Sequence, residues 1–178
     1  MMKSIKQRGL TLLEITAGLV IIALAGVAIA SFASGAIRDS KVEKNSTVLS
    51  QVEQSIRRVY TNKNNFAGLS DAALANSGLL PDSITNGASI RGPYGTVRVW
   101  PISIGCGGCN DGFAITFLNV PSDVCLKFAS RDYGTRLNNL LVAPTTSTSY
   151  TSVMGNISTA ATRCRAADEL RLQFQYRK

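Results

Sequence analysis

The chain has 178 residues, a net charge of +8, four cysteines and no histidine. Without histidine, Ser-His-Asp catalysis, Cys-His catalysis and any histidine-containing metal site are excluded. No Walker or dinucleotide-binding glycine motif is present, so we expect a protein that is not an enzyme and has no cofactor. The length suits one domain plus an anchor, and the cysteines are more typical of an exported protein with disulfides than of a cytosolic one.

The N-terminal stretch combines a basic leader with a long apolar run. Residues 1–9 form the leader, which ends at Gly9. The 23 residues 15–37 carry no charge, and about 18–20 apolar residues are enough to span a bilayer. Glu14 stands at the start of this run, where a carboxylate is costly and therefore indicates a function.

Two ordinary interpretations of this stretch leave part of it unexplained. A secretory signal has an apolar region of only about 7–15 residues and no acid inside it. A plain membrane anchor with basic residues on its cytoplasmic side accounts for the length. It does not account for the glycine at position 9 or the glutamate at position 14.

A long helix is predicted from Leu10 to about residue 62, because no proline interrupts this stretch. Its first part, residues 10–37, is apolar on all sides. In its second part, residues 38–62, apolar side chains recur at helical spacing and form one stripe. The stripe consists of Val42, Leu49, Val52, Ile56 and Val59. We expect a globular domain to cover it.

The remaining residues predict a small α+β domain. Short helices are predicted at 71–77, 123–130 and 158–165, the first capped by Ser70 and the second by Ser122. Strands are predicted at 95–100 and 169–176, where apolar and polar residues alternate, and at 112–118. The first two strands should be antiparallel, and the last should pack one face on the core. Loops are predicted at 81–92, 101–110 and 145–151, while 134–142 is ambiguous.

This order of features resembles the type IV pilin superfamily along nearly the whole chain. In that superfamily a prepilin peptidase cuts after a glycine, and the fifth mature residue is glutamate. Here the cut would fall between Gly9 and Leu10, and Glu14 is the fifth residue counted from Leu10. Leu10 as first mature residue, the turn at 92–95 and the Cys-bearing C-terminal segments look closest to the type IVb branch. That branch includes bundle-forming, toxin-coregulated and conjugative thin-pilus pilins, although the nine-residue leader is shorter than usual for it.

The resemblance implies a fold and a domain organisation. The fold is α+β, with a long N-terminal helix packed against a small antiparallel sheet and a disulfide-linked C-terminal region. The expected parts are a leader (1–9), a transmembrane and polymerisation helix (10–37), an amphipathic half-helix (38–62) and a globular head (63–178). The resemblance also implies that the peptidase methylates the new Leu10 amine, and that Glu14 pairs with this amine of a neighbouring subunit.

The cysteines fall into two groups. The resemblance makes Cys125–Cys164 the disulfide that bounds the pilin D-region, residues 125–164. Cys106 and Cys109 form a single C-x-x-C pair. On the residues alone, this pair is a local disulfide across the turn between the first two strands, part of a metal site, or two free thiols.

The function implied by the resemblance is that of a structural subunit, a major pilin, of a homopolymeric pilus filament. The precursor would sit in the inner membrane of a Gram-negative bacterium, be processed by the prepilin peptidase and be polymerised by the membrane assembly machinery. The extracellular filament would serve adhesion, aggregation or DNA transfer, with host surfaces, bacterial surfaces or DNA as binding partners. A minor pilin and a pseudopilin of a type II secretion system are the alternatives.

Overall fold

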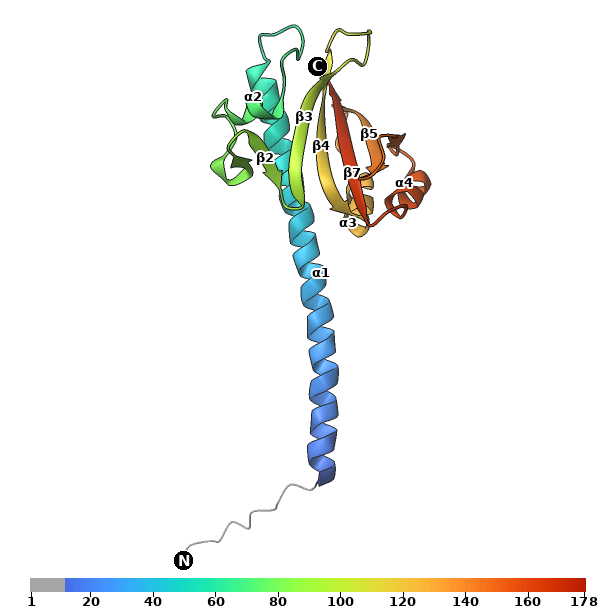
Figure 1. Cartoon of the computed structure of the whole chain (residues 1–178). Helices are drawn as coiled ribbons and strands as arrows, with labels where there is room; N and C mark the ends of the chain where they lie inside the picture. Colours follow the sequence, from blue (N-terminus) through green and yellow to red (C-terminus); the bar gives the residue numbers. More distant parts are fainter. Residues whose placement is uncertain (1–11) are drawn as a thin grey trace, which may run out of the picture. The chain divides into compact units, whose positions relative to one another are not determined.

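Figure 1 shows the computed structural model of the chain, which describes residues 12–178 except for the side chains of 12–14, 24–35 and 38. Gly9 and Leu10 lie outside the described residues, and so does the side chain of Glu14. The chain divides into two units, Met1–Ser40 and Lys41–Lys178.

The first unit holds the N-terminal part of helix α1, which is assigned to Leu12–Val59. Apolar side chains near its beginning, such as Ile21 and Ile22, are exposed. Residues 24–35, which belong to the predicted transmembrane run 10–37, lie outside the described side chains. Among the described residues, no helix contains a segment of the length and apolarity that crossing a membrane requires.

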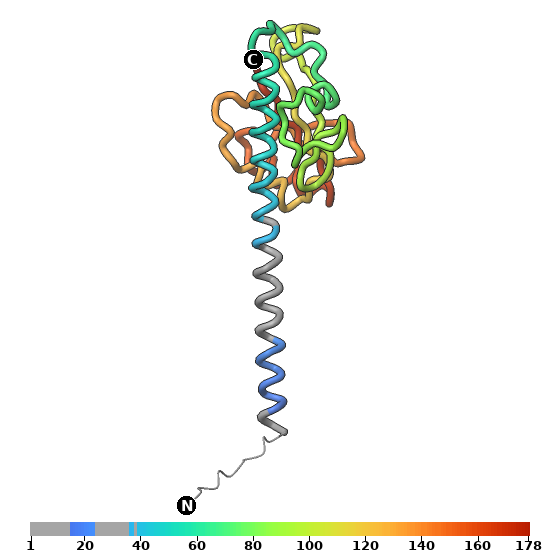
Figure 2. The backbone as a smooth tube through the Cα atoms, turned by 90° about the vertical axis from the view of Figure 1, so that its left-hand side faces the viewer, coloured from blue at the N-terminus to red at the C-terminus, as the bar shows by residue number. Residues whose placement is uncertain are grey.

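The second unit begins with the remainder of α1, which runs alongside the rest of the unit (Figure 2). Of the predicted stripe, Val42, Leu49, Val52 and Ile56 are buried. Val59 was wrongly included, because it is the last residue of α1 and remains exposed. Tyr60 and Phe66 close this end of the core instead, with their ring centroids 5.3 Å apart.

A seven-stranded sheet forms the centre of the second unit, in the order β1-β2-β3-β4-β7-β5-β6. Every pairing is antiparallel. The strands are β1 (Thr85–Asn86), β2 (Ser89–Gly92), β3 (Gly95–Ile102), β4 (Gly112–Pro121), β5 (Leu137–Pro144), β6 (Thr151–Ser152) and β7 (Glu169–Arg177). The last strand of the chain therefore lies inside the sheet, between β4 and β5 (Figure 1).

The three predicted strands are confirmed as β3, β4 and β7, each slightly longer than expected. The predicted antiparallel pairing of the first two is confirmed by the register, in which Val97 faces Phe117. The loop prediction for 81–92 is wrong, because this segment forms a short 3-10 helix, η1 (Asp82–Ile84), and strands β1 and β2. These strands have two and four residues. Such short segments do not show a recognisable alternation of apolar and polar residues. The ambiguous residues 134–142 contribute most of β5.

The short helices are α2 (Asp71–Ala75), α3 (Ser122–Ala129) and α4 (Ile157–Cys164). Ser70 caps α2 as predicted, its side chain accepting a hydrogen bond from the Ala73 N–H. The prediction that Ser122 caps α3 is wrong: Ser122 is the first helical residue and Pro121 precedes it without a side-chain cap. Strand β4 pairs up to Pro121, so the helix starts directly at the end of the strand.

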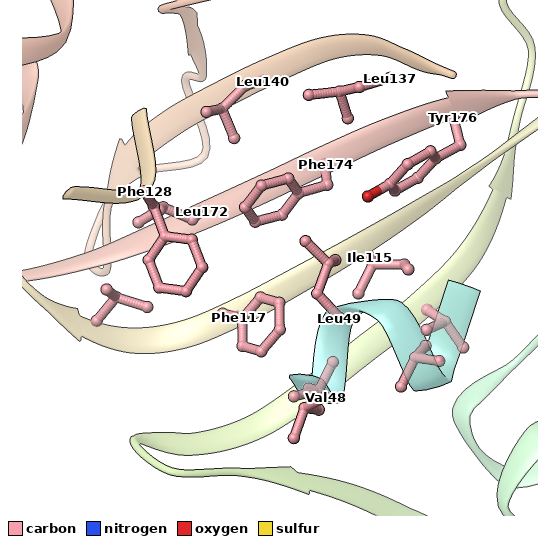
Figure 3. Packing of buried hydrophobic residues seen from close by; sticks show 14 of the residues in the cluster. Val48, Leu49, Ile115, Phe117, Phe128, Leu137, Leu140, Leu172, Phe174 and Tyr176 are labelled. Atoms are coloured by element: carbon pink, nitrogen blue, oxygen red, sulfur yellow. The ribbon is translucent and has the colours of Figure 1, made fainter. Parts of the chain in front are cut away.

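The core lies between α1 and the sheet, as Figure 3 shows. Val48 and Leu49 of α1 lie beside Ile115 and Phe117 of β4, and side chains of β5 and β7 continue the cluster. Phe174 is the aromatic centre, with ring centroids 6.0 Å from Phe117, 6.0 Å from Phe128 and 5.1 Å from Tyr133. The four alternating apolar residues of β7 are all buried: Leu170, Leu172, Phe174 and Tyr176.

The different burial of two valines on α1 gives a matched test of this packing. Val52 is 0 % exposed and Val59 is 39 % exposed. We expect Val52→Ala to lower the free energy of unfolding by about 2 kcal/mol, from lost apolar burial and the cavity left behind. Val59→Ala should change it by less than about 0.5 kcal/mol. Urea unfolding of the full-length chain in detergent measures both; equal effects would contradict the assigned helix face.

Candidate functional site

The C-terminal disulfide region, residues 125–164, is the part of the head bounded by Cys125 and Cys164. These cysteines form a disulfide that joins α3 to the last residue of α4. Both are buried, so the bond belongs to the core. A closed loop of about 40 residues stabilises the fold by about 4 kcal/mol in the chain-entropy model.

Strand β7 attaches this region to the rest of the sheet. On one side it pairs with β4, and on the other with β5, which lies inside the region. Phe174 faces Ile115 on the β4 side and Leu140 on the β5 side. The region is therefore held by a covalent bond near its ends and by a strand ladder through its middle.

Arg131 connects the region to helix α1. Its guanidinium donates to the Ser46 hydroxyl at 2.6 Å and to the Glu43 carboxylate at 3.1 Å. The groups are partly exposed, so this ion pair contributes at most about 1 kcal/mol. Its role is to place the loop after α3 against the helix. Sequence patterns gave no signal for it, because Arg131 and Glu43 are 88 residues apart.

Exposed apolar side chains mark one face of this region. Met154 is 45 % exposed and Ile157 is 63 % exposed. Both border a hollow of about 450 Å³ that also includes Tyr133 and Arg131. The Tyr133 hydroxyl donates to the Phe128 carbonyl, and burial raises the tyrosine's pKa above its ordinary value. The face thus combines apolar side chains with a charged border, a composition typical of contact surfaces.

Cys106 and Cys109 form a second disulfide, in the turn between β3 and β4. Of the three alternatives open from the sequence, the structure contains the local disulfide. Asp111 lies close enough to both sulfur atoms for a shared metal, but sulfurs bonded to each other are not available as thiolate ligands. The Asp111 carboxylate instead accepts hydrogen bonds from the Ile104 and Gly105 N–H groups, and the Ile104 bond in particular lowers its pKa.

Asn45 is a buried polar residue on the α1 stripe that the sequence interpretation passed over. It lies three residues after Val42 and four before Leu49, so its helical spacing indicates that it lies on the same buried face. Opposite it is Gly92, where an added Cβ would lie 3.2 Å from the Asn45 Oδ1 atom and 3.1 Å from Val97. A glycine at this position lets the end of β2 approach α1 closely.

The two disulfides should contribute unequally to stability. Replacing Cys125 and Cys164 together by serine should lower the free energy of unfolding by about 4 kcal/mol. Replacing Cys106 and Cys109 should cost about 2 kcal/mol, because that bond closes only a four-residue loop. Urea unfolding of the oxidised full-length chain measures both double variants. A larger loss for the Cys106/Cys109 variant would contradict the assigned roles.

Comparison with known proteins places this geometry in a family. The sequence matches the family model of Bundlin over residues 34–177. No curated protein matches it.

Two solved structures share the fold. TcpA, a type IV pilin from Vibrio cholerae El Tor biotype, is 12% identical with a TM-score of 0.56, over 76% of this chain and 98% of that one. A type IV b pilin from Salmonella typhi is 17% identical with a TM-score of 0.53, over 79% of this chain and 99% of that one. This family and fold are those of structural pilins, not of enzymes. The chain therefore belongs to the Bundlin family and is a type IVb pilin.

Proposed function

We propose that this pilin is the major subunit of a type IV pilus, made as a prepilin, cleaved after Gly9 and polymerised through its N-terminal helix into an extracellular filament. One observation carries the proposal: the motif of Gly9, Leu10 and Glu14 precedes the segment 34–177 that matches the Bundlin family. The family match favours a pilus over the pseudopilin alternative.

The processing step rests on the glycine that ends the basic leader. Because Gly9 has no Cβ, a peptidase can approach the backbone closely at this position. Cleavage creates a new amine on Leu10, which the same enzyme would methylate. Before cleavage, the apolar run 10–37 would hold the precursor in the inner membrane, where the assembly machinery receives it.

Assembly would depend on a charge pair between neighbouring subunits. A carboxylate in apolar surroundings is tolerated only when it is paired and hydrogen-bonded. Each processed subunit carries one such acid, Glu14, and one amine, on Leu10, four residues apart in the sequence. A subunit staggered along the filament would bring its Glu14 to the amine of the next. The pair would set the register of packing more than it would add stability.

The head would form the surface of the filament. In this arrangement residues 38–62 carry the head, residues 63–178 complete it, and the D-region 125–164 supplies its contact surface. The exposed Met154 and Ile157 support this assignment, because they lie beside the hollow in that region. Contacts made by many copies would serve adhesion, aggregation or DNA transfer.

Replacing Gly9 tests the processing step. Gly9→Val should leave uncleaved precursor in the inner membrane, because the branched side chain blocks access to the scissile bond. Wild-type filaments sheared from cells should consist mainly of a chain that begins at methylated Leu10, as mass spectrometry of the intact protein will show. A Gly9→Val chain of mature length would count against cleavage at this site. A filament in which this chain is a trace component would assign it to a minor pilin.

Replacing Glu14 separates assembly from folding. Glu14→Ala should leave cleavage and the head intact but abolish or greatly reduce filaments, because the Leu10 amine would be buried without its partner. Glu43→Ala is the comparison, since that acid lies outside the apolar run 10–37 and its ion pair with Arg131 is exposed. Membrane fractionation and the yield of sheared filaments measure the two outcomes. Normal filament yield from Glu14→Ala would refute the register role.

A further inference from the structure

We propose that the Cys106–Cys109 disulfide is a thiol–disulfide exchange site, at which a small-molecule thiol forms a mixed disulfide with Cys106. The proposal concerns the turn between β3 and β4 and does not depend on how the filament assembles. It rests on the exposure of this bond, on the open space around it and on the contacts that hold the turn in place.

The two disulfides of the head differ sharply in access to solvent. Cys125 is 0 % exposed and Cys164 is 1 % exposed. Cys106, by contrast, is an exposed residue, and Cys109 is partly exposed. Disulfide exchange requires a thiolate to reach a sulfur atom, so access decides which bond reacts. The exposed bond should therefore react first, and we infer attack at Cys106 because it is the more exposed of the two residues.

The two residues between these cysteines leave the approach open. A Cβ placed on Gly107 or Gly108 would have no atom within 4 Å other than those of the glycine itself and its two chain neighbours. Gly108 also has a φ of +83°, a conformation that side chains with a Cβ rarely adopt. The two glycines thus add no side chain that would shield the sulfurs.

The turn is anchored by contacts that do not involve sulfur. The Asp111 carboxylate accepts from the Ile104 N–H at 2.6 Å and from the Gly105 N–H at 2.8 Å. The Asn110 N–H donates to the Ser103 hydroxyl, and its carbonyl accepts from the Phe66 N–H. Opening the disulfide would leave these contacts in place. Cys109 would then stay near Cys106 and could close the bond again.

One cation and one anion border the turn. Arg177 reaches this turn, with its Nη2 atom 2.9 Å from the position of a Cβ on Gly105, the residue before Cys106. A neighbouring cation stabilises a thiolate. The Asp111 carboxylate lies within 4.8 Å of both sulfur atoms, and its charge is offset by two backbone N–H groups and by Arg177.

The exchange balances without an oxidant or a reductant. The thiolate of the small molecule attacks the Cys106 sulfur, a new S–S bond forms and the Cys106–Cys109 bond breaks. Cys109 leaves as a thiolate and takes a proton from solvent. Its sulfur lies 3.1 Å from the Cys106 carbonyl oxygen, to which the new thiol can donate. Attack by Cys109 on the mixed disulfide reverses the reaction and releases the small thiol.

Glutathione is the probe for this site. The oxidised full-length chain in detergent is incubated with increasing glutathione until one of its disulfides opens, and is then blocked with N-ethylmaleimide. Cleavage before Asp111 and Asp123 separates Cys106 and Cys109 from Cys125, and mass spectrometry locates each group. We expect glutathione on Cys106 and N-ethylmaleimide on Cys109, with Cys125–Cys164 still intact. Glutathione mainly on Cys109, or opening of Cys125–Cys164 first or at the same concentration, would overturn the proposal.

Two single variants test the assignment of the attacked sulfur. In Cys109→Ser the remaining thiol has no neighbour to displace glutathione, so oxidised glutathione should accumulate on Cys106. In Cys106→Ser the remaining Cys109 is less exposed, so its adduct should form several-fold more slowly. Circular dichroism should show that both variants keep the fold, because the turn is held by its hydrogen bonds. Equal rates in the two variants would contradict selective attack at Cys106.

Discussion

Burial of one face of α1 against the sheet is the constraint on which the rest of the head depends. The face is apolar except at Asn45 and Ser55, and Val52 and Ile56 at its centre have no exposed surface. An amphipathic helix gains most of its stability from such packing rather than from intrinsic propensity. The sheet in turn has its inner apolar side chains covered by this helix. Without the sheet, the apolar face of α1 would be exposed to water, and without α1 the inner face of the sheet would be exposed.

Alternation of apolar and polar residues was sufficient to predict β3 and β7, because the alternate apolar side chains of these long strands pack on the core. Strand β4 was also predicted, but it lacks this alternation, and its residues from Gly112 to Phe117 are all buried. The same reasoning could not find β1, β2 and β6, which have between two and four residues. Such strands exist only because a longer neighbour offers its backbone groups for pairing. These short strands are defined by tertiary pairing and not by a sequence pattern. The same holds for β5, because the consecutive Asn138 and Asn139 interrupt its alternation of apolar and polar residues.

The candidate site was predictable to the extent that its chemistry is local. The C-x-x-C spacing indicated a local pairing without deciding it, whereas the pairing of Cys125 with Cys164 came from family resemblance. Spacing in sequence does not determine which distant cysteines meet. The contacts of Arg131 with α1 and of Asp111 with its turn depend on the folded backbone and had no pattern to reveal them. The motif of Gly9, Leu10 and Glu14 remains a sequence-based prediction.

The position of β7 has a consequence for the order in which the head can form. A chain is synthesised from its N-terminus, so residues 169–177 are the last part of the sheet to be made. Until then β4 and β5 have no partner on their facing edges, and exposed strand edges invite pairing with other chains. A chain that ends early lacks the middle of its sheet rather than a dispensable edge. Incomplete subunits would therefore fail to fold and would be open to proteolysis. Because β7 lies in the middle of the sheet, only chains that include it can form a stable head.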